Sequence, residues 1–362
     1  MKHINLSDAS VIPVEHWHKL ENGLIQCDLC PRECQLHENQ RGFCFVRGRK
    51  DDQVWLTSYG RSSGFCIDPI EKKPLNHFLP GSSVLSFGTA GCNLACKFCQ
   101  NWDMSKARDM DRLLDQASPQ MLAEAAKKHH CDSVAYTYND PVIFYEYAID
   151  TALACREQGI KNIAVTAGYI SEKPRETFFK AMDATNIDLK AFNERFYQKL
   201  TGAKLQPVLD TIEYVAKETD TWLELTTLLI PGENDSEKEI AEMSEWIMEH
   251  CGDEVPLHFT KYHPDYRMMN NPETPIETLE KARKIAMKAG LKYVYTGNVL
   301  DFEGQATYCP NCAKKVIERK YYEITDWQLQ DSCCQHCNTP IAGVFKQQPG
   351  NWGNKRLPIK LG

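Results

Sequence analysis

The chain has 362 residues, of which 42% are hydrophobic and 25% charged, and its formal net charge is −7. This composition is typical of a well-packed globular protein and excludes a disordered chain. The acidic balance argues against a protein that binds nucleic acid by neutralising its phosphates. No apolar run reaches ~18 residues, and the N-terminal residues lack the apolar stretch of a secretion signal. We therefore expect a cytoplasmic protein without a membrane span.

The sixteen cysteines are the most unusual feature of the composition. In a large chain without an export signal, clustered cysteines are more often metal ligands than disulfide partners. Most of them fall into three clusters, which are Cys27, Cys30, Cys34 and Cys44; Cys92, Cys96 and Cys99; and Cys309, Cys312, Cys334 and Cys337. We predict that each cluster binds metal. Cys131, Cys155 and Cys251 are predicted to be small buried hydrophobic residues.

Between the second and third clusters, short β-rich runs alternate with amphipathic helices. The predicted strands cover residues 83–87, 133–137, 162–166, 185–189, 222–229, 256–260 and 292–295. Repeated strand–helix units predict a parallel sheet in an α/β fold. We expect the sheet to close partly or almost completely into a TIM-like (β/α) barrel. A doubly wound open sheet is the alternative.

Several of the predicted helices have explicit start signals. Ser118 precedes a proline, and Ser236 with Glu239 forms a capping box. Thr274 begins a second capping box with proline at the first helical position, and Gly290 is expected to end that helix.

The segments before residue 80 and after residue 300 break the strand–helix alternation. We therefore expect four parts. These are an N-terminal Cys-rich segment over residues 1–80, the barrel over 81–300, a zinc-ribbon-like module over 301–350 and a polar tail over 351–362.

The central cluster, Cys92, Cys96 and Cys99, directly follows the first predicted strand, where a barrel places its chemistry. These short spacings let one loop wrap three corners of an iron–sulfur cube, for which cysteine thiolates are the usual ligands. No fourth cysteine lies nearby, and a catalytic metal site keeps one position open where a structural site fills it. We predict a [4Fe–4S] cluster whose open iron can bind the amino and carboxylate groups of S-adenosylmethionine (SAM). The alternative is a zinc ion completed by a distant histidine.

At this motif, SFGTAGCNLACKFCQNW, the chain resembles the radical SAM superfamily. The runs DPIEKKPL, from Asp68, and HFLPG, from His77, narrow the resemblance to the AmmeMemoRadiSam-system radical SAM enzymes, relatives of the pyruvate formate-lyase activating enzymes. The resemblance extends from Cys27 to about Cys337. It implies a 5′-deoxyadenosyl radical that abstracts hydrogen from a substrate, with an electron donor of the flavodoxin or ferredoxin type. It also implies Memo-like and Amme-type partner proteins.

Polar or Gly-rich segments follow the predicted strands and would share one rim of the barrel, which indicates a site there. The resemblance assigns SAM contacts to Phe98, Asn139, Asp140, Asp188, Lys190 and His263. Members of the family usually carry glutamate at the position of Asp140. Lys190 belongs to a segment that lines the methionyl group, where an ammonium suits the carboxylate. Packing in the core is the alternative role for Phe98.

The flanking clusters have different spacings and so different expected metals. Cys27, Cys30, Cys34 and Cys44 lie on a short segment punctuated by Gly and Pro, and a thiolate tetrad suits either an auxiliary iron–sulfur cluster or structural zinc. The paired C-x₂-C motifs at Cys309 and Cys334 are close to zinc-ribbon spacing. We predict zinc there, with a rubredoxin-like iron site as the alternative.

The sequence does not identify the substrate. Kinship with activating enzymes favours hydrogen abstraction from a partner protein, and modification of a small molecule or lipid is the alternative. A different class of function is a non-catalytic zinc scaffold. The adjacent Lys72 and Lys73 are predicted to be a solvated surface pair rather than contacts to an anionic substrate.

Overall fold

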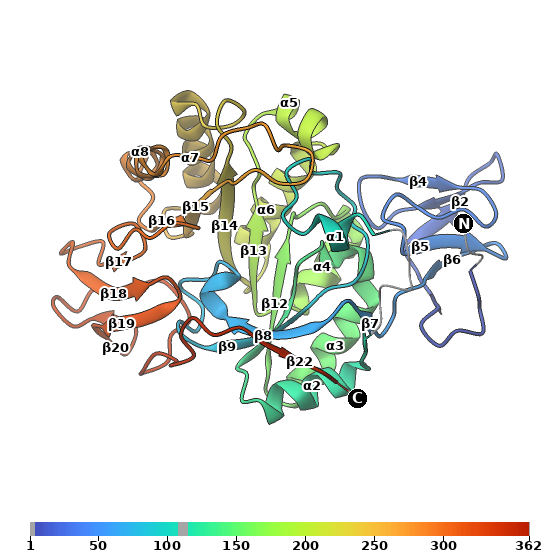
Figure 1. The fold of residues 1–362 in the computed structure, drawn as a ribbon, viewed down its shortest axis with the longest axis horizontal. Coiled ribbons are helices and arrows are strands. Elements are labelled where there is room, and N and C mark those ends of the chain that lie inside the picture. Colours follow the sequence, from blue (N-terminus) through green and yellow to red (C-terminus); the bar gives the residue numbers. More distant parts are fainter. Residues whose placement is uncertain (1–3, 108–114, 362) are drawn as a thin grey trace.

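The computed structural model describes residues 4–107 and 115–361, which form a central sheet with a small module on either side (Figure 1). The sheet has nine strands in the order β16-β15-β14-β13-β12-β11-β9-β8-β22. From β9 to β16 the neighbours pair in parallel, whereas β8 and β22 are antiparallel strands at one edge. The strands are β8 (Phe65–Pro69), β9 (Ser83–Phe87), β11 (Ser133–Tyr136), β12 (Lys161–Thr166), β13 (Ala184–Asp188), β14 (Trp222–Leu229), β15 (Leu257–Lys261), β16 (Val294–Gly297) and β22 (Leu357–Ile359).

Helices alternate with these strands along the chain, which confirms the predicted strand–helix units. They are α2 (Pro119–Lys128), α3 (Tyr145–Glu157), α4 (Glu172–Lys180), α6 (Gln206–Glu218), α7 (Glu237–Cys251) and α8 (Ile276–Lys288). The parallel strands lie side by side in chain order, so the sheet lacks the reversal of strand order that defines a doubly wound fold. Within the described residues no strand pairing joins β16 to β22, so the barrel is partial and not closed.

The helix start signals are confirmed in part. Ser118 and Ser236 each accept a hydrogen bond from the amide three residues later, as predicted. Glu239 does not complete the capping box, because its carboxylate accepts hydrogen bonds from the amide of Phe192 (2.8 Å) and from a neighbouring side chain. The capping box at Thr274 is wrong. Its hydroxyl instead donates to the carbonyl at the end of β14 (2.6 Å), and α8 begins two residues later.

The two faces of the sheet are covered differently. Successive side chains of a strand point to opposite faces, and on one face residues such as Leu85 and Phe87 pack into the core with the helices. On the other face Val84 and Ala135 pack against residues from the loop that joins β8 to β9. We call residues 70–80 the inner segment, because they fill the concave face of the partial barrel. It begins with the 3₁₀ helix η1 (Ile70–Lys72).

Polar contacts hold the inner segment in place. The amides of Asn76 and His77 donate to the buried carboxylate of Glu224 on β14 (2.9 and 2.8 Å). Arg319 from the C-terminal module donates to the Asn76 carbonyl (2.7 Å). Buried backbone groups need such partners where no strand pairs with them. The inner segment therefore connects the sheet to the C-terminal module.

The DPIEKKPL run has a structural role at this place. Asp68 is fully buried on β8 and pairs with Lys72 (2.8 Å) and Lys73 (2.7 Å), while the Tyr138 hydroxyl donates to it (2.7 Å). Burial acts to raise the pKa of Asp68, but the lysines and Tyr138 bring it well below its usual range. The prediction of a solvated lysine pair is wrong for Lys73, whose side chain is 2% exposed. The buried carboxylate of Asp68 needs a paired positive charge, and so the Lys73 ammonium is buried with it.

The N-terminal module consists of two small antiparallel sheets, and the C-terminal module lies on the opposite side of the central sheet (Figure 1). The N-terminal strands are β1 (Ile12–Pro13), β5 (Arg47–Lys50) and β6 (Gln53–Leu56) in one sheet, and β2 (Trp17–Lys19), β3 (Ile25–Cys27) and β4 (Cys34–Leu36) in the other. The C-terminal strands are β17 (Thr307–Tyr308), β18 (Lys315–Lys320), β19 (Glu323–Trp327), β20 (Leu329–Gln330) and β21 (Cys333–Cys334). A further short pair joins β7 (Arg61–Ser62) to β10 (Asp115–Gln116).

Two boundaries differ from the expected division into parts. Residues 351–362 are not only a polar tail, because β22 within them pairs with β8. The central sheet likewise includes β8, which lies within the predicted N-terminal segment. No described helix combines the length and apolar character that crossing a membrane requires.

Glu71 in the inner segment predicts a pH dependence of stability. Burial raises its pKa from 4.5 to about 7, against the opposing effect of Arg319, and its Oε2 has no hydrogen-bond partner. The folded state therefore binds this proton more tightly, and stability falls as pH rises from about 4.5 to 7, by about 3 kcal/mol. Glu71→Gln should remove this decline, measured as the urea midpoint between pH 5 and 8 in the metal-loaded protein. The same pH dependence in both proteins would contradict the assignment.

Candidate functional site

The loop that carries Cys92, Cys96 and Cys99 follows β9 directly and lies at the carboxyl edge of the parallel strands. Because β9 and β11 to β16 run in the same direction, the polar segments that follow each strand share this edge. The predicted common rim is therefore confirmed. We call residues 88–99 the cysteine loop.

Hydrogen bonds from distant parts of the chain fix the cysteine loop. The side chain of Asn93 donates to the Tyr169 carbonyl (2.9 Å), which lies beyond β12. The Lys97 amide donates to the Leu200 carbonyl (2.9 Å), and its carbonyl accepts from the Arg267 amide (3.0 Å). The loop is thus held by the segments that follow β12, β13 and β15. Loops with so many external partners keep a fixed geometry, which a metal site needs.

Two glycines allow the close approach of the backbone around this loop. A Cβ at Gly88 would lie 2.4 Å from the carbonyl oxygen of Thr137. Gly91 has φ +85°, in the left-handed region, and a Cβ there would lie 2.0 Å from the carbonyl oxygen of Cys44. A side chain is therefore excluded at both positions on steric grounds. The second contact joins the cysteine loop to the N-terminal module.

The thiols of the cysteine loop are largely buried and lie among charged groups. Burial raises the pKa of Cys92 to about 12, Asp140 adds to this rise, and Lys106 opposes it. Burial also raises the pKa of Cys96, against the effect of Lys190. A metal makes such thiolates stable by binding them. The donor set of three thiolates on one loop therefore fits an iron–sulfur cluster.

The structure excludes Cys131 as a fourth ligand. Its neighbouring residue Asp132 donates through its amide to the Ser83 carbonyl (3.2 Å), at the start of β9. The cysteine loop leaves β9 at the other end. The alternative of a zinc ion completed by a distant histidine gains no support from His129 and His130, because the His130 carbonyl accepts a hydrogen bond from the Ser83 hydroxyl (3.3 Å).

Asp188 and Lys190 lie beside the cysteine loop, as the resemblance implies. The Lys190 ammonium donates to Asp188 (2.9 Å), and both groups are close enough to shift the pKa of Cys96. Burial acts to lower the pKa of Lys190, but Asp188 and Cys96 raise it, so that its side chain stays positively charged. A fixed cation close to the Cys96 thiol can bind a carboxylate. Its contact with SAM stays a prediction.

Asn139 and Asp140 are buried, and their side chains form hydrogen bonds within the protein. Asn139 accepts a hydrogen bond from the Thr89 amide (3.0 Å) and donates to the Gly91 carbonyl (2.8 Å), which shapes the cysteine loop. Asp140 caps the 3₁₀ helix η3 (Pro141–Phe144) and accepts from the Ala167 amide (2.9 Å). Both residues thus hold the rim together. Their predicted contact with the SAM amino group stays a prediction.

The remaining predicted SAM contacts differ in exposure. Phe98 is 4% exposed and packs against Phe196, with ring centroids 5.6 Å apart. This packing fits a role in the core, which was the alternative to a contact with SAM. His263 is exposed and lies just beyond β15. A role for either residue in binding SAM stays a prediction.

The four C-terminal cysteines form one compact group of thiols. The sulfur atoms of these four cysteines all lie within 4.8 Å of one another. Within the described residues, no other three His, Cys, Asp or Glu side chains bring their ligand atoms this close together. The Cys309–Cys337 and Cys312–Cys334 sulfurs are 3.5 and 3.7 Å apart. Thiolates at tetrahedral zinc lie about 3.8 Å apart, from a Zn–S distance of ~2.3 Å. The predicted grouping is confirmed, and the geometry suits one tetrahedral ion.

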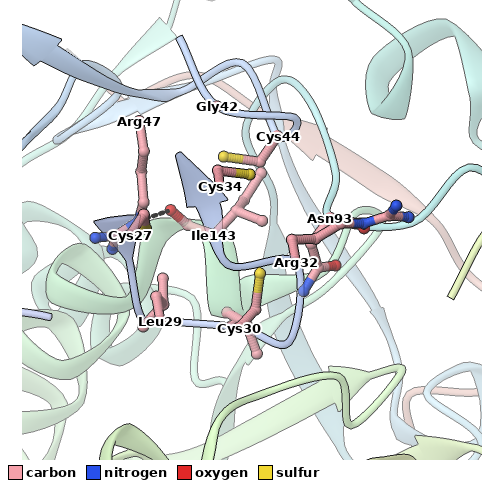
Figure 2. A pocket seen from close by; sticks show the side chains of 11 residues that line it. Cys27, Leu29, Cys30, Arg32, Cys34, Gly42, Cys44, Arg47, Asn93 and Ile143 are labelled. Atoms are coloured by element: carbon pink, nitrogen blue, oxygen red, sulfur yellow. Dashed lines mark hydrogen bonds between the residues drawn. The ribbon is translucent and has the colours of Figure 1, made fainter. Parts of the chain in front are cut away.

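The N-terminal cysteines also converge. Cys27, Cys30, Cys34 and Cys44 line one small, largely enclosed cavity, and the sulfurs of Cys30, Cys34 and Cys44 point into the same space (Figure 2). All sixteen cysteines of the chain are free thiols.

Apart from Lys190, the basic residues of these sites were not revealed by sequence patterns. Lys106 lies close to Cys92 and Cys96 and donates to the Leu94 carbonyl (2.8 Å). Arg32 and Arg47 line the N-terminal cavity. A lone basic residue carries no spacing signal, so only the folded chain shows that it lies beside a thiol.

Comparison with known proteins agrees with this site. The profile of the Radical SAM superfamily matches residues 87–244. The uncharacterized protein MJ0808 of Methanocaldococcus jannaschii is 39% identical over 327 residues, which cover 90% of this chain and 97% of that protein. The pyruvate formate-lyase-activating enzyme of Clostridium pasteurianum is 23% identical over 59% of this chain and 91% of its own length. A domain of the pyruvate-formate lyase-activating enzyme from Bacteroides vulgatus covers 46% of this chain and 99% of its own, with 22% identity and a TM-score of 0.41.

The chain belongs to the radical SAM superfamily, and activating enzymes are among its homologues. Membership implies an enzyme with a [4Fe–4S] cluster and SAM, which agrees with the three thiols of the cysteine loop.

Gly91→Ala tests the contact between the cysteine loop and the N-terminal module. The Cβ would clash with the Cys44 carbonyl and strain the backbone, which costs about 1–3 kcal/mol for the conformation alone. We expect iron bound after anaerobic reconstitution to fall at least severalfold. Gly159→Ala is the matched control, because Gly159 has φ +73° and nothing within 4 Å of the added carbon. Equal iron contents in the two variants would contradict the proposed contact.

Proposed function

We propose that this chain is a radical SAM enzyme that cleaves SAM at a [4Fe–4S] cluster and uses the radical to abstract hydrogen from a substrate. The observation that carries the proposal is the cysteine loop. It presents three buried or half-buried thiols at the carboxyl edge of the sheet, with Asp188 and Lys190 beside them. Cys92, Cys96 and Cys99 would hold a [4Fe–4S] cluster, which when bound would supply the electron for breaking the sulfonium C–S bond of SAM, with methionine and a 5′-deoxyadenosyl radical as the products.

The protein's own residues prepare this chemistry. Lys190 offers a positive charge to the methionyl carboxylate, and Asp188 keeps that ammonium in place. Asn139 and Asp140 order the rim through their hydrogen bonds to the Gly91 carbonyl and the Ala167 amide. The inner segment fills the opposite end of the concave face, and so it excludes water from that side.

For the substrate, we propose a partner protein in preference to a small molecule or lipid. Support comes from the relatives named as activating enzymes. The DPIEKKPL run further supports assignment to the AmmeMemoRadiSam system, with Memo-like and Amme-type partners and a flavodoxin- or ferredoxin-type electron donor. For the C-terminal cysteines we propose zinc, because the sulfur spacing suits one tetrahedral ion.

Cys96→Ala should abolish SAM cleavage, because two thiolates do not hold the cluster. The measurement is 5′-deoxyadenosine formed by the anaerobically reconstituted, dithionite-reduced protein, and we expect a loss of at least a hundredfold. Bound zinc should remain, because the C-terminal module is separate. Cys155→Ala is the control, since Cys155 is a buried thiol that lies on α3, away from the cysteine clusters.

Two results would contradict the proposal. Retained cleavage in Cys96→Ala would reject the ligand assignment. A colourless wild-type protein that binds zinc alone after reconstitution would favour the non-catalytic scaffold.

The substrate can be found by isotope tracing. Deuterated candidate partner proteins and deuterated metabolite pools are incubated separately with enzyme, reductant and SAM. Hydrogen abstraction should transfer deuterium to 5′-deoxyadenosine, measured by mass spectrometry, and we expect the label from a protein. Label from the metabolite pool alone would contradict the proposed substrate class.

A further inference from the structure

We infer that Cys27, Cys30, Cys34 and Cys44 hold a second iron–sulfur cluster, and not a single zinc ion, and that it passes electrons to the cluster of the cysteine loop. The assignment of the cluster stands on the geometry of the N-terminal module alone. Its role in electron transfer rests on the proposed function.

The N-terminal fold brings the four thiols together from a short segment. Cys27 ends β3 and Cys34 begins β4, and these two residues are direct partners across the strand pair. Cys30 lies in the turn between them, and Cys44 lies in the loop that precedes β5. The side chains therefore approach one space from three sides. That space is the cavity in Figure 2.

The spacing of the sulfurs separates this site from the C-terminal one. A single tetrahedral ion brings thiolates to about 3.8 Å from one another. The C-terminal thiols have this spacing, and all four of them lie within 4.8 Å of one another. In the part of the chain that the structure describes, no three of the four N-terminal sulfurs lie that close together. Thiolates that bind different irons of a cubane lie farther apart, because the cubane itself separates them. The wider arrangement around a cavity fits a cluster.

Two arginines, the buried Arg47 and the half-buried Arg32, provide positive charge for an anionic group in this cavity. Arg47 is 1% exposed, donates from Nε to the Ile143 carbonyl (3.1 Å) and pairs with Glu146, while its Nη1 has no partner. Arg32 also lines the cavity, and its Nη2 is buried without a partner. A buried hydrogen-bond donor without a partner destabilises the folded protein. A cluster with four thiolates is anionic and would offer an acceptor to both of these unpartnered donors.

The cavity shares a wall with the cysteine loop. Asn93, which follows Cys92, lines the cavity, and its carbonyl accepts a hydrogen bond from Arg32 Nε (2.7 Å). The Cys44 carbonyl lies against Gly91, the residue before Cys92. Among the cysteines that line the cavity, Cys30 and Cys34 are partly exposed. A cluster here would therefore lie between the surface and the cluster that cleaves SAM.

This position suits single-electron transfer. A reduced flavodoxin or ferredoxin would give one electron to the second cluster, which would then reduce the cluster of the cysteine loop. Cleavage of one SAM consumes that electron and yields methionine and the 5′-deoxyadenosyl radical. Each donor molecule is oxidised by one electron for each SAM that is cleaved.

Metal and sulfide analysis of the reconstituted wild-type protein tests the cluster. We expect about eight irons and about eight sulfides in two [4Fe–4S] clusters and about one zinc per chain. The variant C92A/C96A/C99A should keep about four irons and four sulfides with the Mössbauer signature of a cubane. About four irons and two zinc ions in the wild type would overturn the inference while leaving the proposed function intact. Absence of iron would reject both. If the triple variant does not fold, the wild-type stoichiometry decides.

Cys34→Ala tests the electron path. SAM cleavage should fall at least tenfold with reduced flavodoxin or ferredoxin as donor, while the rate with excess dithionite stays near the wild-type value. The control Cys155→Ala should change neither rate. Unchanged rates with both reductants would overturn the electron-transfer role. An equal loss with both would also overturn it, since it would indicate a damaged cysteine loop.

Discussion

The close contact between the backbone at Gly91 and the carbonyl of Cys44 is the constraint on which the rest of the site depends. It places the N-terminal module directly against the cysteine loop, and it does so at the residue that precedes the first thiol. The loop is then fixed from the other sides by the segments that follow β12, β13 and β15. Three thiols are thereby held in a rigid frame, while the residue after Cys131 bonds to the opposite end of β9. A cluster held by these three thiols alone would keep a coordination position for a cosubstrate.

The inner segment explains how a partial barrel stays stable. An open concave face would expose apolar strand residues, and residues 70–80 cover it with their own side chains. Their buried amides are satisfied by Glu224, and Arg319 ties the same segment to the C-terminal module. The module that carries the C-terminal cysteines therefore supports the inner segment. The two cysteine groups lie in different parts of the fold, since the C-terminal group belongs to this module and the cysteine loop follows β9.

Sequence patterns predicted the strands and the rim well, because a buried parallel strand is a short apolar run and polar residues mark where it ends. They also predicted the C-terminal cysteine grouping, because the repeat of C-x₂-C reflects a local geometry. They failed where contacts between residues distant in the sequence determine what a side chain does. Thr274 resembles a helix cap but bonds to β14, and Lys73 resembles a surface residue but pairs with buried Asp68. The strand pairing of residues 357–359 has no local signal, because an edge strand this short gains its partner only in the fold.

The radical chemistry proposed for this chain requires an open iron in a cluster bound by the cysteine loop. The most direct measurement is electron–nuclear double resonance on the dithionite-reduced protein with SAM whose methionyl amino and carboxylate groups carry magnetic isotopes. If SAM binds the iron that the protein leaves free, both labelled groups should show hyperfine coupling to the cluster. A reduced cluster whose spectrum is the same with and without labelled SAM would contradict this binding.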